Sequence, residues 1–269
     1  MPRTTDLTLV RSLLDRDRPW AAYAIGDLSS ALAAECEWRV PADGAPALLL
    51  LYRGFVPPIA FAMGAPDHLA PLFQEIDAAE ISLHIQPEAI AALQPAYQPV
   101  QTRPMWRMVV EPGSFTPAPI ESATKLGDSD LESLTALYDD GHPHGEGPTF
   151  FHPAMLRQGT FYGIREGADL IAVAGTHLVS PELSVCTVGN VYTRRDRRRQ
   201  GLGARVTSAV VTRALADGIA TIVLNVSQEN AGARRVYEQL GFRCYCSFVE
   251  GEAVSASSPT RRPPVRKRL

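Results

Sequence analysis

The sequence predicts a mixed α/β (α+β) fold with two mixed-sheet domains in tandem. The chain has 269 residues, 45% of them hydrophobic, so it can bury one large core or two smaller ones. Short apolar runs typical of strands alternate with helical patterns in both halves of the chain. A stretch of proline and turn-forming residues, 111–119, separates the halves. We therefore expect a first domain over residues 1–116 and a second over 117–250.

The first half contains alternating helical and strand-like segments. We expect a helix within residues 11–30, strands near Trp38 and over 48–52, 58–63 and 105–110, and helices over 66–75 and 87–93. This order predicts a small domain with a sheet of its own.

The second half has a more sharply marked order of elements. A helix follows residue 204, with Val206, Val210 and Ala214 on one face, and Gly218 is expected to cap its end. Residues 219–226 are expected to form a buried strand. A second helix begins near Asn230 and ends at Gly241, and residues 242–249 return as a strand.

The last segment, residues 251–269, differs in composition from the rest. Serines and prolines run into Arg261, Arg262, Arg266, Lys267 and Arg268. Such a segment has too little apolar surface to bury, so we expect a basic, disordered tail.

Composition and charge exclude several classes of protein. A net charge of −3 gives no bulk attraction to nucleic acid. No apolar run is long enough to span a bilayer and the first residues lack a secretory apolar segment, so we expect a cytoplasmic protein without a membrane partner. The four cysteines, Cys36, Cys186, Cys244 and Cys246, lack metal-binding spacing, so we expect reduced thiols and no metal site.

The segment Arg198–Ala204 has the features of an anion-binding turn. Gly201 and Gly203 let the backbone approach a ligand closely, and the first N–H groups of the following helix lack partners within that helix. The helix dipole and the neighbouring guanidinium groups favour a diphosphate over a neutral ligand. A dinucleotide fingerprint would need a glycine at Val206, and the Walker loop's Gly-Lys-Ser/Thr is absent.

Taken together, the motifs resemble the acyl-CoA-binding core of the GNAT superfamily of N-acyltransferases. They are the strand, the Arg198-x-x-Gly201-x-Gly203 turn, and Asn230-x-x-Ala233-x-x-x-Tyr237 before Gly241-Phe242. Residues 189–193 (GNVYT) resemble the glycine N-acyltransferase-like branch, and Gly189 indicates a strand bulge. The order of elements in the first half resembles a second GNAT unit. There Gly64-Ala65-Pro66-Asp67 offers one glycine and an acidic side chain, so we interpret that half as degenerate.

The resemblance implies acetyl-CoA, or another short acyl-CoA, as the cofactor. The residues that it assigns to the coenzyme are Val191, Tyr192, Thr193, Arg198, Arg199, Gln200, Gly201, Leu202, Gly203, Ala204, Asn230 and Tyr237. The chain departs from the common family pattern at Arg195 and Arg199, where proline and glycine are frequent. We therefore expect a different detailed path for this turn.

Tyr237 is the expected general acid. A phenol with a pKa near 10 is protonated at neutral pH and can donate to the departing thiolate, whose conjugate thiol has a pKa of about 8.5. The alternative is that Tyr237 is a core aromatic on an apolar helix face, and that Asn230 serves only as a helix cap.

The acceptor site is expected in the loop that contains Asp140, His142, His144 and Glu146. Either histidine could take a proton near neutral pH, or both could belong to a solvated surface loop. His177 is interpreted as a core histidine. If the amine arrives neutral, no dedicated base is required.

We therefore expect an enzyme, a GNAT-type N-acetyltransferase that moves an acetyl or short acyl group to a primary amine, with a small-molecule amine as the acceptor. The alternative is an inactive CoA-binding or regulatory module. The composition disfavours a third hypothesis, a nucleic-acid-binding protein, which rests on the arginines near residue 198 and in the tail. A homodimer is compatible with the sequence.

Overall fold

The computed structural model describes residues 3–29, 32–148 and 151–257, which divide into two compact units. The first unit comprises residues 3–6, 35–103 and 249–257 of the described chain. The second comprises residues 7–29, 32–34, 104–148 and 151–248. Within the described part of the chain, no helix is both long and apolar enough to cross a membrane.

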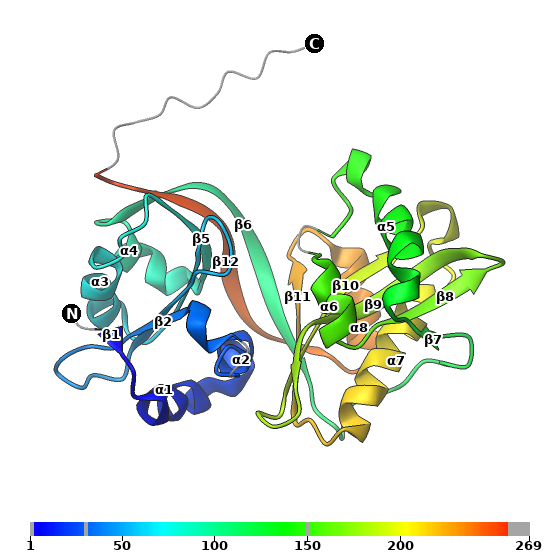
Figure 1. Cartoon of the computed structure of the whole chain (residues 1–269), viewed down its shortest axis with the longest axis horizontal. Coiled ribbons are helices and arrows are strands. Elements are labelled where there is room, and N and C mark those ends of the chain that lie inside the picture. The colour runs from blue at the N-terminus through cyan, green and yellow to red at the C-terminus, as the bar shows by residue number, and fades with distance from the viewer. Residues whose placement is uncertain (1–2, 30–31, 149–150, 258–269) are drawn as a thin grey trace, which may run out of the picture. The chain divides into compact units, whose positions relative to one another are not determined.

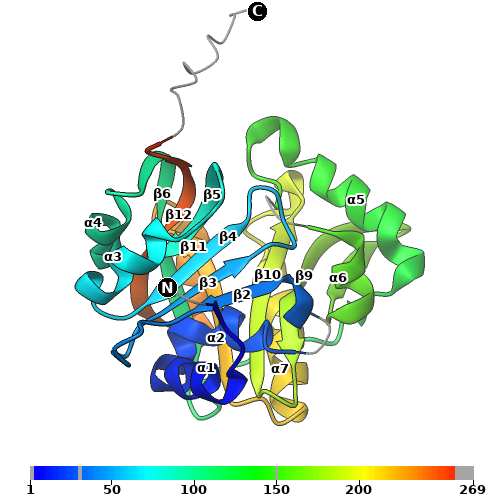
Figure 2. The same cartoon turned by 60° about the vertical axis from the view of Figure 1, so that its left-hand side comes forward.

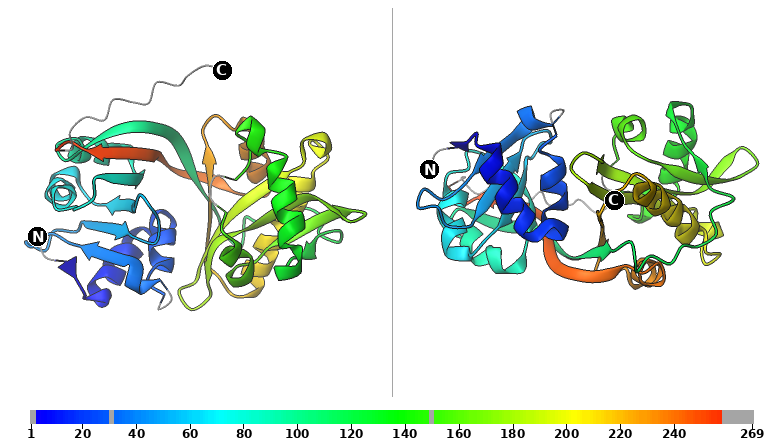
Figure 3. Two further views of the ribbon diagram at one scale, coloured as in Figure 1. Left: turned by 45° about the horizontal axis from the view of Figure 1, so that its top comes forward. Right: turned by 90° about the horizontal axis from the view of Figure 1, so that it is seen from below.

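These bounds differ from the expected division near Pro117. Residues 7–34 and 104–116 belong to the second unit, and residues 249–257 belong to the first. The reason lies in two long strands, β6 (Tyr97–Val110) and β12 (Arg243–Ser255), which are neighbours in the sheet and each contribute residues to both units (Figure 3). A strand that continues past a unit boundary gives no break in the secondary-structure pattern there, even though Pro104 lies directly at the boundary in β6.

The first unit is a mixed sheet covered by short helices. Its elements are β1 (Arg3–Thr4), β2 (Cys36–Arg39), β3 (Leu48–Tyr52), β4 (Ile59–Met63), α3 (Pro66–Gln74), β5 (Glu80–Ile85), η3 (Pro87–Ala89), α4 (Ile90–Leu93) and parts of β6 and β12. The strand order is β1-β2-β3-β4-β5-β12-β6, with β4 and β5 parallel and α3 between them in the chain. Both α3 and α4 pack on one side of this sheet (Figure 2), around Leu72, Phe73 and Leu93.

The second unit is built on a six-strand order, β6-β11-β10-β9-β8-β7. Its elements, besides β6 and β12, are α1 (Leu7–Leu14), η1 (Asp15–Asp17), α2 (Arg18–Gly26), β7 (Thr124–Lys125), η4 (Asp128–Asp130), α5 (Leu131–Asp139), η5 (His142–His144), α6 (Pro153–Gln158), β8 (Tyr162–Glu166), β9 (Asp169–Ser180), β10 (Val185–Thr193), η6 (Arg195–Arg197), α7 (Leu202–Ala216), β11 (Thr221–Ser227) and α8 (Ala231–Gln239). A further short helix, η2 (Ala33–Glu35), lies at the unit boundary. The pair β10–β11 is parallel, whereas β6–β11, β9–β10, β8–β9 and β7–β8 are antiparallel.

Two groups of helices cover the opposite faces of this sheet. On one face, α7 and α8 enclose a core that includes Val188, Val206, Leu224 and Tyr237. On the other face, α5 and α6 pack around Phe161 and a second cluster. Figure 1 shows α7 and α5 on opposite sides of β8 and β9. We call these the α7 face and the α5 face.

The N-terminal helix α2 is part of the second unit. It lies against β9, β10 and β11, where Ala22 joins a buried cluster with Val109 and Val223. The helix begins after Asp17, whose side chain accepts a hydrogen bond from the Trp20 N–H at 3.2 Å. Because Val223 alternates along β11 with Ile222 and Leu224 of the α7 face, α2 covers the α5 face.

The predicted helix ends are confirmed. Gly218 and Gly241 follow α7 and α8 and adopt left-handed backbone conformations, with φ values of +75° and +91°. They differ in surroundings. A Cβ at Gly218 would meet nothing within 4 Å, whereas one at Gly241 would lie 1.9 Å from the Ser114 carbonyl oxygen.

This contrast gives a stability prediction. Gly218→Ala should cost about 1 kcal/mol, the strain of a left-handed alanine alone. Gly241→Ala should cost about 3 kcal/mol or more, because the backbone near Ser114 must also shift. The free energy of unfolding in urea, measured for both variants, tests this. Equal losses would contradict the close contact at Gly241.

The expected tail begins later in the chain than residue 251. Residues 251–255 continue β12 and pair with β5, from Gly251 opposite Leu83 to Val254 opposite Glu80. Ala253 is fully buried there. Small residues alternating with polar ones can fill a strand without the apolar pattern that predicts one. The basic part of the expected tail, from residue 258 onward, lies outside the described residues.

Candidate functional site

The turn before α7 has an unusual backbone. Arg199 has a φ of +62° and Gly201 a φ of +74°, and α7 begins at Leu202. The N–H of Arg205 donates to the Gly201 carbonyl oxygen at 3.2 Å, which closes the first helical turn. The N–H groups of residues 202–204 therefore lie in the first turn, where the helix offers them no acceptor and its dipole is positive. This is the backbone arrangement of an anion site.

The two glycines keep the turn open. A Cβ at Gly201 would meet nothing within 4 Å, and one at Gly203 would meet only Thr193 Oγ1, at 3.5 Å. The turn is therefore not filled by neighbouring side chains at these positions. The matching turn of the first unit is different, because a Cβ at Gly64 would lie 2.5 Å from the Ala47 Cβ. There α3 also begins with Pro66, which has no N–H to offer.

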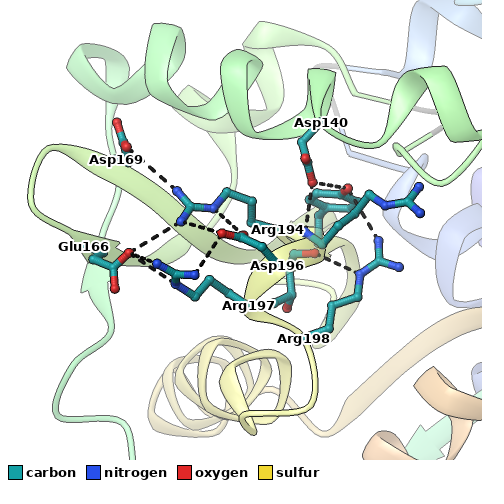
Figure 4. Close-up of polar contacts among 10 residues, drawn as sticks. Asp140, Glu166, Asp169, Arg194, Asp196, Arg197 and Arg198 are labelled. Carbon is teal, nitrogen blue, oxygen red and sulfur yellow. Dashed lines mark hydrogen bonds and ion pairs between the residues drawn. The ribbon is translucent and has the colours of Figure 1, made fainter.

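Most of the arginines near the turn are paired with carboxylates (Figure 4). Arg194 pairs with Asp196 at 2.7 Å, and Arg197 pairs with Glu166 at 2.5 Å. The hydrogen bond from Arg197 is the main cause that lowers the pKa of Glu166. Arg199 is exposed and takes part in none of the ion pairs found among the described residues. Of the predicted diphosphate ligands, Arg199 is thus the guanidinium most available to an anion.

Glu146 joins the predicted acceptor loop to the turn. Its carboxylate lies 2.7 Å from Arg198 Nη2 and 3.3 Å from Arg195 Nη1. The hydrogen bond from Arg198 is the main cause of the lowered pKa of Glu146. The exposed His142 instead contacts Asp139, at 3.1 Å, and is not part of this link.

Asp140 makes a second link between the same two segments. Its Oδ2 accepts hydrogen bonds from the Tyr192 hydroxyl at 2.8 Å and from the Arg195 N–H at 3.0 Å. The bond from Arg195 is the main cause of the lowered pKa of Asp140. Burial, reinforced by Asp140, raises the pKa of Tyr192 to about 12. The exposed His144 helps to lower the pKa of Glu146 through its charge. The structure therefore brings Asp140 and Glu146 to the turn, and leaves His142 and His144 at its periphery.

The predicted bulge in β10 is confirmed. Between the pairs Gly189–Gly175 and Tyr192–Val173, β10 has one residue more than β9. Asn190, inside the bulge, has a φ of +52°. The bulge takes Asn190 and Val191 out of the regular β9–β10 register, which resumes at Tyr192 and Thr193, shortly before the turn that precedes α7.

The strands β10 and β11 part at the same level. Their ladder runs from Val185 opposite Thr221 to Val188 opposite Leu224, although β11 continues to Ser227 and stays paired with β6. Beyond Val188 the backbone of β10 has therefore left the β11 ladder. A strand edge released in this way can hydrogen-bond an extended ligand.

Two of the predicted residues lie on α8. The side chain of Asn230 accepts a hydrogen bond from the Ala233 N–H at 3.0 Å. Asn230 therefore caps α8, which is the alternative role expected from the sequence. Tyr237 is 7% exposed and belongs to the same buried cluster as Val188 and Leu224. Val188 and Leu224 form the last pair in the ladder between β10 and β11. Burial raises the pKa of Tyr237 to about 12, which keeps its hydroxyl protonated.

A polar chain on the α5 face was missed by the sequence reasoning. The Tyr23 hydroxyl of α2 lies 2.9 Å from His177 Nδ1, and Asn225 Nδ2 donates to the Tyr23 oxygen at 3.4 Å. These residues come from α2, β9 and β11, far apart in the sequence. The only local signal was a histidine in an apolar strand. The structure shows His177 to be partly buried and hydrogen-bonded, as a core histidine with a polar partner would be.

Within the described residues, no group of three or more His, Cys, Asp or Glu side chains is placed to hold a metal ion. The site combines an open anion-binding turn, a released strand edge, and hydroxyl and imidazole groups near that edge.

The comparisons with known proteins agree with this geometry. Residues 130–242 match the model of the Acetyltransferase (GNAT) family. A crystal structure of a GNAT-family acetyltransferase, named as putative, from Novosphingobium aromaticivorans is 27% identical, with 73% of this chain and 84% of that chain covered and a TM-score of 0.56. A search of curated proteins found no match.

Two more distant structures share the fold. A Drosophila protein is 14% identical over 95% of this chain and 92% of its own, with a TM-score of 0.67. A GCN5-related N-acetyltransferase from Kribbella flavida is 21% identical over 88% of this chain and 96% of its own, with a TM-score of 0.55. At these identities the likeness concerns the fold alone.

Proposed function

We propose that this protein, an N-acetyltransferase whose residues 130–242 form a GNAT acetyltransferase domain, moves an acetyl or short acyl group from coenzyme A to a primary amine. The observation that carries the proposal is the open turn at Gly201 and Gly203, at the start of α7 and next to the bulge of β10. The turn suits a diphosphate, and the released edge of β10 suits an extended, amide-containing arm.

The diphosphate would lie against the N–H groups of residues 201–204, with Arg199 and Gln200 beside it. Arg198 would contribute from its position between Glu146 and Tyr192. The backbone of residues 191–193 would pair with the pantetheine arm, and Asn230 would approach the coenzyme from α8. When bound, the coenzyme supplies an acyl group activated as a thioester.

Tyr237 would protonate the departing thiolate. Its hydroxyl is protonated at neutral pH, and it belongs to the cluster that lies where β10 and β11 part. Asp140 and Glu146 would hold the acceptor loop against the turn, so that the coenzyme and the acceptor meet in a fixed arrangement.

The first unit would be a degenerate second GNAT unit, with the glycine N-acyltransferase-like branch as the nearest pattern for the whole chain. Two observations support this view. The parallel pair β4–β5 with α3 between them repeats the order of β10, α7 and β11. Its turn at Gly64 is filled by Ala47, so it would not bind a diphosphate.

The experiment that tests the function has two steps. Isothermal titration calorimetry with acetyl-CoA is expected to show binding near one equivalent. Thiol release from acetyl-CoA is then measured with glycine, spermidine, tyramine and a peptide with a free N-terminus. Release stimulated by at least one amine is the expected result. Binding without any stimulated release would instead favour the inactive coenzyme-binding module, and an absence of binding would overturn both.

A further inference from the structure

The helix α2 places a tyrosine next to the point where β10 and β11 part. The Tyr23 hydroxyl is hydrogen-bonded to Asn225. Asn225 directly follows Leu224, the last residue of β11 that pairs with β10. The Tyr23 hydroxyl is also hydrogen-bonded to His177, at 2.9 Å. Tyr23 thus touches one residue at each side of the opening, since His177 lies over β10.

The position of His177 is fixed by Gly189. A Cβ at Gly189 would lie 2.3 Å from the imidazole ring, so only glycine leaves room for the ring over the start of the β10 bulge. On the opposite side the Tyr23 ring packs on the guanidinium of Arg107, at 4.7 Å. The imidazole and the phenol are therefore held in place from both sides.

The two tyrosines lie on opposite faces of the sheet. Tyr237 belongs to the cluster of the α7 face, together with Leu224 and Val226. Because side chains alternate along β11, Asn225 points to the other face, where α2 carries Tyr23. A thioester held in the opening would thus have one hydroxyl group on the side of its sulfur and another on the opposite side, open to an acceptor.

We infer that Tyr23 and His177 form the proton-accepting relay for the acceptor amine, and that Asn225 orients that amine. This inference rests on the proposed acyl transfer. Tyr23 would be the catalytic residue, because its oxygen would contact the amine, and His177 would act through Tyr23. Asn225 is a positioning residue for the primary amino group.

The relay provides a destination for the proton that the amine loses. The amine nitrogen forms the new C–N bond to the acyl carbon while the C–S bond to coenzyme A breaks. One N–H proton of the amine passes to the Tyr23 oxygen, and the Tyr23 hydroxyl proton passes to His177 Nδ1. The thiolate takes its proton from Tyr237. His177, which is only partly buried, afterwards returns its proton to water.

His177 is neutral before the reaction. Burial, with a further contribution from Arg107, lowers the pKa of His177 to about 4, so the imidazole is uncharged at pH 7 and Nδ1 can accept the hydrogen bond of the Tyr23 hydroxyl. The same two causes disfavour the imidazolium, so His177 holds the proton only transiently while the C–N bond forms.

Asn225 provides the selectivity for a primary amine. Its Oδ1 is buried and has no hydrogen-bond partner among the described residues. A primary amine carries two N–H groups, so one can donate to this oxygen and the other to the Tyr23 oxygen. A buried acceptor without a donor is unfavourable, and a correctly placed N–H would remove that cost.

The test compares Tyr23→Phe, His177→Gln and the double variant, using acetyl-CoA and the amine of the panel that gives the fastest thiol release. Glutamine can still accept the Tyr23 hydrogen bond but cannot take its proton, so His177→Gln preserves a structural role and removes the relay. Each single variant is expected to lower kcat about 100-fold. The double variant should lose no more than either single one, as for groups that act as a unit.

The matched control is Tyr245→Phe. It removes another hydroxyl group that contacts the α2 segment, since the Tyr245 hydroxyl donates to Asp17 at 2.7 Å. We expect kcat within about 3-fold of wild type, and acetyl-CoA affinity and melting temperature near wild type in all variants.

Two outcomes would overturn the relay. The first is that the wild-type protein is active and that Tyr23→Phe and His177→Gln retain its kcat. The proposed function would then still stand. The second is a double variant whose loss equals the product of the two single losses. If none of the amines stimulates thiol release by the wild-type protein, the proposed function itself fails, and the relay fails with it.

Discussion

Gly203→Glu should abolish acetyl-CoA binding in a calorimetric titration. Gly203 lies in the first turn of α7, where a new side chain would extend into the open space of the turn. The carboxylate would occupy the place of the diphosphate and repel it, and would also satisfy the helix N–H groups that an anion needs. We expect the dissociation constant to rise at least about 1,000-fold, a loss of roughly 4 kcal/mol.

Two controls separate this effect from a change in folding or in charge. Gly203→Ala adds a Cβ at an ordinary 3.5 Å from Thr193 Oγ1, so it should bind acetyl-CoA within a few-fold of wild type. It should also be slightly more stable, because alanine is favoured over glycine in a helix by about 1 kcal/mol. Gly113→Glu adds the same charge where a Cβ would meet nothing within 4 Å. Normal binding by Gly203→Glu would exclude this turn as the coenzyme site.

The turn was predictable because its signals are local. A short stretch of sequence contains the glycines of the turn, Gly201 and Gly203, and the capping Gly218. The left-handed backbone at Gly201 and Gly218 shows why glycine is needed there. The bulge at Gly189 was predictable for the same reason. Backbone requirements within a few residues can be recognised in the sequence, whereas packing between distant segments cannot.

The charge state of the turn could not be predicted from the arginine run. Arg197 and Arg198 look equally free in the sequence, yet Glu166 pairs with the first and Glu146 with the second. These carboxylates are separated from the arginines by 31 and 52 residues. Only the fold decides which guanidinium groups stay available to a ligand.

The division into compact units also depends on long-range packing. The apolar face of α2 predicts that a sheet covers the helix, but not which sheet covers it.

The hydrogen bond between Tyr23 and His177 joins residues that are 154 positions apart in the sequence. A chain of polar groups assembled from three elements leaves no spacing pattern in the sequence, so the proposed acceptor side of the site could be inferred only from the structure.

Tyr237→Phe should lower kcat about 100-fold and leave the acetyl-CoA dissociation constant nearly unchanged. The substitution removes only the hydroxyl group, and the ring keeps its packing against Phe242, at 6.1 Å between centroids. Thiol release measures kcat and calorimetry measures affinity. Tyr162→Phe is the matched control, because Tyr162 packs against the same cluster but has no proposed role. Full activity of Tyr237→Phe would remove this residue from the chemistry.

The panel of amines distinguishes the two tyrosines. In the proposed mechanism Tyr237 acts on the departing thiolate, which is the same whichever amine attacks, so the loss in Tyr237→Phe should be similar for every amine. In the proposed relay Tyr23 acts on the amine itself, so the loss in Tyr23→Phe should vary with the acidity of the N–H proton that must be removed. Because the two tyrosines belong to different side-chain clusters on opposite faces of the sheet, the losses of Tyr23→Phe and Tyr237→Phe in activation free energy should add in the double variant.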